Sequence, residues 1–208
     1  MKKFMEKYNV SRETFSKLKL YEALLKEWQL KFNLVSKSSL DDAWNRHFED
    51  SVQLFKYIPE NAKVLYDFGS GAGFPAMVLA IMANEKTPYL KVKLIESIGK
   101  KTLYLNEVKK QTNTDVEIIN DRIENIKPEK ADVITSRAMA SLVQLLEYTK
   151  KFCNKKTICI FPKGKKFQEE IDEARKKFNF DCQVYDSEIS SEGKVLIISN
   201  ISKITGVK

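Results

Sequence analysis

The sequence predicts an α/β protein in which seven strands form a mostly parallel sheet with helices on both faces. From about residue 62 onward, short apolar runs alternate with helical patterns, as is typical of βα units. The last two strands, near 180–186 and 194–201, have only a short polar link between them, which predicts an antiparallel hairpin at the sheet's end. Residues 1–60 are mainly helical in pattern and predict a helical appendage before a sheet domain at 61–208.

The appendage is expected to contain two helices. Apolar side chains recur every three or four residues over 11–32, and Ser11 is a suitable N-cap for that helix. A polar break follows at 33–39. The second helix is expected to begin near residues 41–42 and to end before Pro59.

Strands and helices alternate through the remainder of the chain. The strands are expected at 63–68, 90–96, 115–119, 131–136, 156–161, 180–186 and 194–201. The intervening helices are expected at 74–84, 98–112, 141–152 and 166–178. In a doubly wound sheet, ligands bind beyond the carboxyl ends of the strands. Functional side chains are therefore expected directly after strands.

Composition limits the classes of protein to which the chain can belong. Its 208 residues fit one ordinary domain with an appendage, and a hydrophobic content of 43% is enough for a packed core. No apolar run approaches the roughly 18 residues of a membrane span, and the first residues lack the apolar segment of a signal peptide. One histidine and three cysteines without C-x-x-C spacing predict no metal site and a reducing, cytoplasmic compartment.

The positive charge is concentrated in two segments. Residues 1–40 carry nine Lys/Arg against four Glu, and residues 150–177 carry ten against four acids, within a net charge of +8. Two separate basic segments suit a polyanionic partner. A lysine-rich surface that reflects an AT-biased genome is the alternative.

The most informative stretch is the glycine-rich turn after the first strand. Asp67 ends an apolar run, and Gly69, Gly71, Gly73 and Phe74 follow it. Glycine lets the backbone turn sharply and lets a ligand approach without a Cβ in the way. The spacing is G-x-G-x-G, not the G-x-G-x-x-G of dinucleotide sites, and an aspartate here would repel phosphate and attract a sulfonium or ammonium. The turn resembles motif I of S-adenosylmethionine-dependent methyltransferases, and a turn without a ligand is the alternative.

Three further strand ends carry side chains suited to such a cofactor. Glu96 ends the second strand, near the spacing of a carboxylate that binds ribose hydroxyls, although a surface glutamate is also possible. Ile123 and Glu124 follow the third strand and are placed to meet adenine, although an acid there also suits a helix N-terminus. Ser136 and Arg137 follow the fourth strand, where many amine-methylating enzymes have Asp/Asn-Pro-Pro-Tyr/Phe, so an exocyclic amine is not the expected target.

Together these segments resemble the RsmG (GidB) family of bacterial methyltransferases that act on small-subunit ribosomal RNA. The resemblance covers most of the chain. The chain departs from the family in having Glu96 where Asp is frequent, and in a lengthened link around 84–88. The segments that carry the resemblance are Arg46–Ser51, Asp67–Pro75, Glu96–Lys101, Ser136–Ala138 and Pro162–Gly164.

The resemblance implies a Rossmann-like class I methyltransferase fold and methyl transfer from S-adenosylmethionine to N7 of one guanosine in 16S ribosomal RNA. Guanine N7 has a lone pair and no proton, so no general base is needed, and catalysis would rest on alignment and electrostatics. The resemblance implies cofactor contacts by Gly69, Phe74, Ile123, Glu124 and Arg137. The turn and the second strand add Asp67, Gly71, Gly73 and Glu96 to that set.

Basic side chains beyond the strand ends are the candidates for contact with the substrate. Lys163, after the fifth strand, and Arg137 are the expected catalytic residues, and a solvated lysine is the alternative for Lys163. His47 is expected either to close over the pocket or to fix the appendage as a buried histidine. The two basic segments would hold RNA phosphates, and a monomer would leave that face free. The expected substrate-binding residues are Arg46, His47, Lys100, Arg122 and Lys163.

Three other functions remain open on the sequence alone. The two basic segments disfavour a methyltransferase of a small molecule. The intact acidic residues and glycines of the cofactor motif disfavour a non-enzymatic ribosome-binding module. The glycine spacing and the terminal hairpin disfavour a dinucleotide-dependent oxidoreductase.

Overall fold

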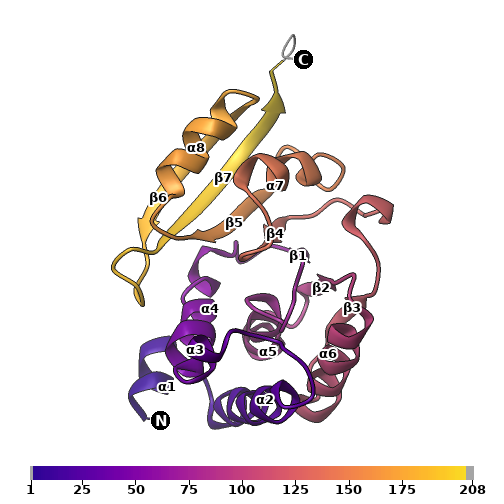
Figure 1. Cartoon of the computed structure of the whole chain (residues 1–208), viewed down its shortest axis with the longest axis vertical. Coiled ribbons are helices and arrows are strands. Elements are labelled where there is room, and N and C mark those ends of the chain that lie inside the picture. The colour runs from indigo at the N-terminus through magenta and orange to yellow at the C-terminus, as the bar shows by residue number, and fades with distance from the viewer. Residues whose placement is uncertain (1, 205–208) are drawn as a thin grey trace.

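A computed structural model, which describes residues 2–204, confirms the predicted α/β architecture. The strands are β1 Val64–Phe68, β2 Lys91–Ile95, β3 Glu117–Ile119, β4 Val133–Thr135, β5 Ile158–Lys163, β6 Phe178–Asp186 and β7 Lys194–Lys203. They form one sheet in the order β3-β2-β1-β4-β5-β7-β6 (Figure 1). β1 to β5 are parallel, and β7 runs antiparallel to both β5 and β6, so the terminal hairpin is confirmed.

Helices cover both faces of the sheet. Those of the sheet region are α5 Ala76–Lys86, α6 Gly99–Thr112, α7 Leu142–Thr149 and α8 Phe167–Arg175, with a short 3-10 turn at Ile123–Asn125. The appendage contains α1 Lys2–Tyr8, α2 Arg12–Gln29, α3 Lys37–Leu40, a π-helical turn at Trp44–Glu49, α4 Asp50–Val52 and a 3-10 turn at Phe55–Tyr57. None of the helices within residues 2–204 is long and apolar enough to cross a bilayer.

The appendage departs from the prediction in its second half. The single helix expected before Pro59 is broken into a π-helical turn, α4 and a 3-10 turn. In the π-helical turn the backbone N–H of Asp50 reaches Asn45 O, while Arg46 O accepts from the side chain of Arg137 at 2.9 Å. A contact across 91 residues thus occupies a carbonyl that a regular helix would use, and no local pattern predicts it. Helix α1 and the short α3 were also not predicted.

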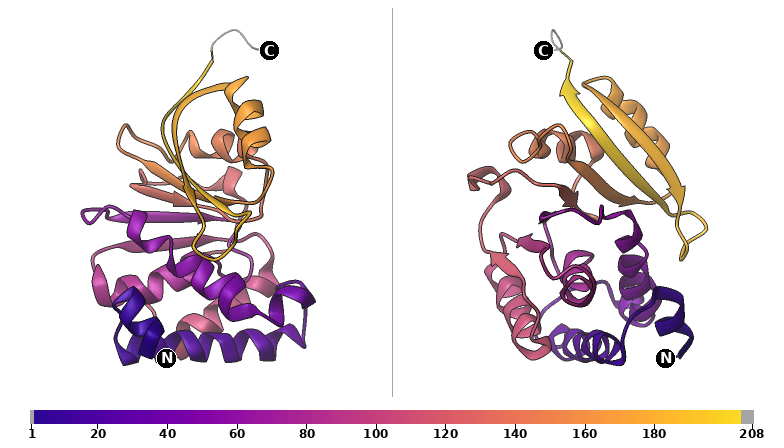
Figure 2. Two further views of the ribbon diagram at one scale, coloured as in Figure 1. Left: turned by 90° about the vertical axis from the view of Figure 1, so that its left-hand side faces the viewer. Right: turned by 180° about the vertical axis from the view of Figure 1, so that it is seen from behind.

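Two buried clusters fill the two faces of the sheet. α1, α2 and α4 pack with α5 and α6 over one face, and α7 and α8 cover the other (Figures 1 and 2). Leu65 of β1 belongs to the first cluster, whereas its neighbours Val64 and Tyr66 belong to the second, as the alternation of side chains along a strand requires. Residues 76–83 of α5 are buried throughout because the helix lies between the sheet and the appendage. The division of the chain at residue 60 stays a prediction, while the packing joins both parts in one core.

Candidate active site

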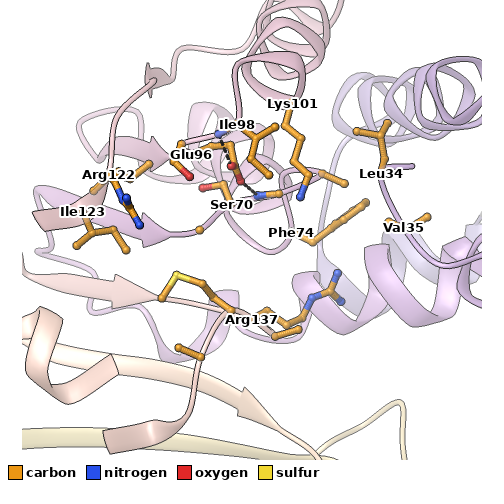
Figure 3. A pocket seen from close by; sticks show the side chains of 18 of the residues that line it. Leu34, Val35, Ser70, Phe74, Glu96, Ile98, Lys101, Arg122, Ile123 and Arg137 are labelled. Carbon is orange, nitrogen blue, oxygen red and sulfur yellow. Dashed lines mark hydrogen bonds between the residues drawn. The ribbon is translucent and has the colours of Figure 1, made fainter. Parts of the chain in front are cut away.

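A cavity of about 520 Å³ lies beyond the carboxyl ends of β1 and β2 (Figure 3). The glycine turn, the segments after β2, β3 and β4, and two stretches of the appendage enclose it. Most residues expected to contact the cofactor therefore line one cavity, and their contact with the cofactor stays a prediction. The main lining residues are Leu34, Val35, His47, Gly69, Gly71, Phe74, Glu96, Ile98, Lys101, Arg122, Ile123, Glu124, Arg137 and Met139.

Two glycines of the turn open the cavity floor. Gly69 and Gly71 have φ values of +64° and +57°, a region that side chains with a Cβ rarely adopt. A Cβ at Gly71 would meet nothing nearer than Gly69 O at 3.8 Å, so the space above it is free. At Gly69 a Cβ would strike the side chain of Met139, which covers this residue.

The carboxylate of Glu96 holds the turn in place. Its two oxygens accept the backbone N–H groups of Gly71 and Ile98, each at 2.8 Å (Figure 3). The side chain is 5% exposed and lines the cavity. Because each carboxylate oxygen has a second lone pair, Glu96 retains acceptor capacity toward a ligand.

Asp67 lies beneath the turn and does not line the cavity. Its Oδ1 accepts the Thr135 hydroxyl at 2.6 Å, and its Oδ2 is buried without a partner among the described residues. Burial raises the pKa of this carboxyl to about 7, and the hydrogen bonds from Thr135 and Ser70 offset part of that rise. Its contact with a cofactor stays a prediction, and in the structure it supports the turn from behind.

Gly73 faces the appendage. A Cβ there would collide with the Tyr21 hydroxyl of α2 and crowd Leu105 and Met77. Its φ of +94° also favours glycine. Tyr21, which is fully buried, donates its hydroxyl to Ala72 O at 2.5 Å. This glycine therefore serves the packing of the turn on α2, and its predicted contact with a cofactor stays a prediction.

Arg137 joins the cavity to the appendage. Its guanidinium donates to Arg46 O at 2.9 Å, pairs with Asp50 at 3.0 Å and reaches His47 Nδ1 at 2.8 Å. It also lies 5.2 Å from the centre of the Phe74 ring. The loop that it begins continues through Ala138, whose φ of +54° is unusual for a residue with a Cβ.

His47 is buried and neutral. Its ring stacks on the Phe74 ring with 4.8 Å between the ring centres. Burial is the largest cause that lowers the pKa of His47 to about 3, and the positive charges of Arg137 and Arg46 add to it. Nδ1 accepts from Arg137, so the hydrogen of the neutral ring is assigned to Nε2, which has no partner among the described residues. In the structure His47 contacts Arg137 and lines the cavity, and its role toward a substrate stays a prediction.

The side chains after β3 form the opposite end of the cavity. Ile123 opens the 3-10 turn and is 7% exposed, and Arg122 lies beside it (Figure 3). The Glu124 carboxylate accepts the Tyr148 hydroxyl of α7 at 3.2 Å. These predicted residues line the cavity together.

A second cavity of about 1130 Å³ adjoins the first and shares Arg137–Ala140 as a wall. Arg46 and Lys163 line this second cavity, whereas Lys100 lines neither. Lys163 is not a solvated lysine, because its side chain is 9% exposed and its Nζ pairs with Glu170 at 2.7 Å. The predicted substrate contacts of these residues stay predictions.

Sequence reasoning missed two parts of the first cavity. Leu34 and Val35 come from the expected polar break and line the cavity because Gln29 binds the backbone of both residues, a tertiary arrangement without a local signal. Lys101 was not singled out, because Lys100 and Lys101 lie four residues before the equally buried Tyr104 and Leu105, so helical spacing does not separate the two lysines. The neighbouring Lys100 is turned by one helical step and is exposed.

Comparison with known sequences identifies relatives over nearly the whole chain. Residues 14–196 match the family model of rRNA small subunit methyltransferase G, or GidB. A ribosomal RNA small subunit methyltransferase G of Rhodospirillum centenum is 41% identical over 199 residues, which cover 96% of this chain and 90% of the relative. One of Orientia tsutsugamushi, strain Ikeda, is 44% identical over 180 residues, covering 86% and 87%.

Solved structures share the fold at low sequence identity. A SAM-dependent methyltransferase from Aquifex aeolicus has a TM-score of 0.58 at 16% identity and covers 78% of this chain and 95% of its own. The ribosomal protein L11 methylase of Lactobacillus delbrueckii subsp. bulgaricus has a TM-score of 0.57 at 17% identity, with coverages of 72% and 76%. The fold is thus the Rossmann-like one of class I methyltransferases. By its sequence, the chain belongs to the rRNA small subunit methyltransferase G (GidB) family.

Proposed function

We propose that this chain transfers a methyl group from S-adenosylmethionine to N7 of a guanosine in 16S ribosomal RNA. The observation that carries the proposal is the first cavity, around which the glycine turn, Glu96, Ile123, Glu124 and Arg137 meet. Membership of the methyltransferase G family supports the substrate class.

The residues around the first cavity fit the cofactor. The free space above Gly71 admits a ligand close to the backbone, and Glu96 has acceptor capacity for ribose hydroxyls. Ile123 and Glu124 would hold the adenine at the far end. When bound, the cofactor supplies an electrophilic methyl group on a sulfonium.

The second cavity is the proposed entrance for the target base. Its shared wall with the first cavity, Arg137–Ala140, is where the two reactants would meet. Arg137 and Lys163, the proposed catalytic residues, are each paired with a carboxylate, Asp50 and Glu170. Paired cations leave little net positive charge beside a base that becomes cationic on methylation, while fixed polar groups orient it.

RNA phosphates are the proposed ligands of the two basic segments at 1–40 and 150–177. Such contacts position an RNA without reading its sequence. The protein would act as a monomer in the cytoplasm, with its basic face free for the ribosomal subunit. Arg46, His47, Lys100, Arg122 and Lys163 are the proposed contacts nearest the target.

Methyl transfer from labelled S-adenosylmethionine to unmethylated small ribosomal subunits tests the proposal. Nucleoside analysis is expected to place the label in 7-methylguanosine, and Arg137→Ala, verified as folded by circular dichroism, is expected to lose it. Cofactor binding without label in any ribosomal RNA nucleoside would reject the RNA substrate. That result would favour a small-molecule methyltransferase or a non-enzymatic ribosome-binding protein.

A further inference from the structure

The first cavity has two ends with different linings. Arg122 and Ile123 lie at one end, Phe74 and Leu34 lie at the other, and Glu96 lies between them (Figure 3). If Glu96 holds the ribose and Ile123 the adenine, an extended cofactor places its amino-acid part at the end formed by Phe74 and Leu34. That part carries an α-carboxylate, which needs a cation or hydrogen-bond donors when it leaves water.

At the end formed by Phe74 and Leu34, the guanidinium of Arg137 is already bound by other groups of the protein. Its guanidinium is bound by Asp50, by His47 and by a backbone carbonyl, and the Arg137 and Asp50 side chains are 17% and 21% exposed. His47 is neutral and contributes no charge. The positive charge of Arg137 is therefore largely matched inside the protein.

At the end formed by Phe74 and Leu34, Lys101 is the cation without a carboxylate partner among the described residues. It is half-buried, it lines the cavity, and its side chain points from α6 toward the space between Ser70 and Phe74 (Figure 3). Within residues 2–204 it forms neither an ion pair nor a side-chain hydrogen bond. A partly buried ammonium that is directed into a cavity and is paired with no carboxylate is a binding group for an anionic ligand.

The appendage makes this end less polar. Leu34, which is 8% exposed, and Val35 form an apolar wall that faces Lys101 across the cavity (Figure 3). Gln29 fixes that wall, because its side-chain amide accepts the N–H groups of Leu34 and Val35 at 2.9 and 3.0 Å and donates to Val35 O at 2.9 Å. Exclusion of water by an apolar wall strengthens an ion pair beside it.

We propose that Lys101 binds the α-carboxylate of the cofactor and so selects adenosyl sulfur compounds that carry an amino acid over those that lack one. The inference rests on the proposed function, since it assumes the same cofactor in the same cavity. S-adenosylhomocysteine and 5′-methylthioadenosine separate the two parts of the ligand, because both contain the adenosine thioether but only the former has the carboxylate.

Calorimetric titration of the full chain with both compounds tests the proposal. Lys101→Met is expected to weaken S-adenosylhomocysteine binding about 10- to 100-fold, the range for loss of a charge-assisted hydrogen bond, and to change methylthioadenosine binding by less than about 3-fold. Lys101→Arg should recover most of the affinity. Lys110→Met, an exposed position on the same helix, is the matched control and should bind both compounds as the wild type does.

Equal weakening of both compounds by Lys101→Met would overturn the inference, because it would show a general effect on the cavity. Unchanged binding of both would overturn it as well. A wild-type chain that binds neither compound would reject the proposed function itself, and that outcome differs from a selective failure at Lys101.

Discussion

The two cavities share a wall but are built in different ways. The first is lined by backbone N–H groups, apolar side chains and Glu96, most of them within a few residues of a strand end. The second is lined by paired charges, one pair between distant segments, Arg137–Asp50, and one between β5 and α8, Lys163–Glu170. The difference teaches that the floor of the first cavity is encoded by short strand–turn–helix motifs, whereas the second cavity depends on how those motifs are brought together.

Adding volume beneath the turn of the first cavity is expected to have the largest effect. Gly73→Ala places a Cβ against Tyr21 and Leu105 at a positive φ, so the free energy of unfolding should fall by about 3–4 kcal/mol. Gly71→Ala meets open space and should cost only about 1–2 kcal/mol. Urea unfolding measures both, and equal losses would show that Gly73 is not a packing position.

One carboxylate from each cavity, Glu96 and Glu170, offers a direct test of the comparison. Glu96→Ala removes the acceptor for Gly71 and Ile98 and a ribose partner, so S-adenosylhomocysteine affinity should fall by about 100-fold. Glu170→Ala releases Lys163 and the backbone N–H of Leu142 in the second cavity. It should lower methylation of RNA while cofactor affinity stays within about 2-fold. If both variants lost cofactor affinity, the two cavities would not be independent sites.

His47 and Asp67 should have opposite effects on how the stability of the protein changes with pH. The pKa of His47 is about 3, below its usual 6.5, so between these values the unfolded chain binds a proton that the native chain does not, and stability rises with pH. The pKa of Asp67 is about 7, above its usual 3.8, so in that window the native chain holds the extra proton, and stability falls as pH rises. Between pH 3.8 and 6.5 the contributions of His47 and Asp67 to the slope of the unfolding free energy against pH therefore cancel.

Single substitutions should therefore expose each slope. His47→Gln should make the slope of the unfolding free energy against pH more negative than in the wild type, by up to about 1.4 kcal/mol per pH unit. Asp67→Asn should make the same slope more positive by a similar amount. Urea unfolding at several pH values between 3.8 and 6.5 measures the slopes. Parallel profiles for the two variants would contradict the assigned protonation states.

The rim of the second cavity should be the least sensitive region. Glu188 pairs with Lys7 at 3.1 Å and also with Lys56 at 2.5 Å, but all three side chains are 31% or more exposed. Glu188→Gln should lower the free energy of unfolding by less than about 1 kcal/mol, and added salt should remove the difference. A larger, salt-independent loss would mean that the hairpin loop is fixed to the appendage by charge.

The sequence predicted the sheet and the floor of the first cavity because both depend on local patterns. Alternating strands and helices, the glycine spacing and Glu96 at the end of β2 all lie within short windows. The walls were only partly predictable. Leu34 and Val35 reach the cavity through Gln29, and the π-helical turn at Trp44–Glu49 is stabilised by Arg137 from 91 residues away. Such contacts exist only after the chain has folded.

The role of Gly73 was also hidden from the sequence. Its spacing after Gly69 and Gly71 made it look like part of a ligand-binding turn. A positive φ favours glycine at all three positions. Only the neighbours in the folded structure show that Gly73 faces Tyr21. Lys101 is the converse case, since the sequence analysis named its neighbour Lys100, and only the folded structure shows that Lys101 lines the cavity.

Arg137 lines both cavities while the appendage holds its guanidinium, so under the proposed function one side chain is part of two binding equilibria. Free energy does not depend on the order of binding. The factor by which bound RNA changes the affinity for the cofactor therefore equals the factor by which bound cofactor changes the affinity for RNA. Under the proposed function, a difference in RNA affinity between the complexes with S-adenosylmethionine and with S-adenosylhomocysteine would therefore be matched by an equal difference in cofactor affinity with RNA bound.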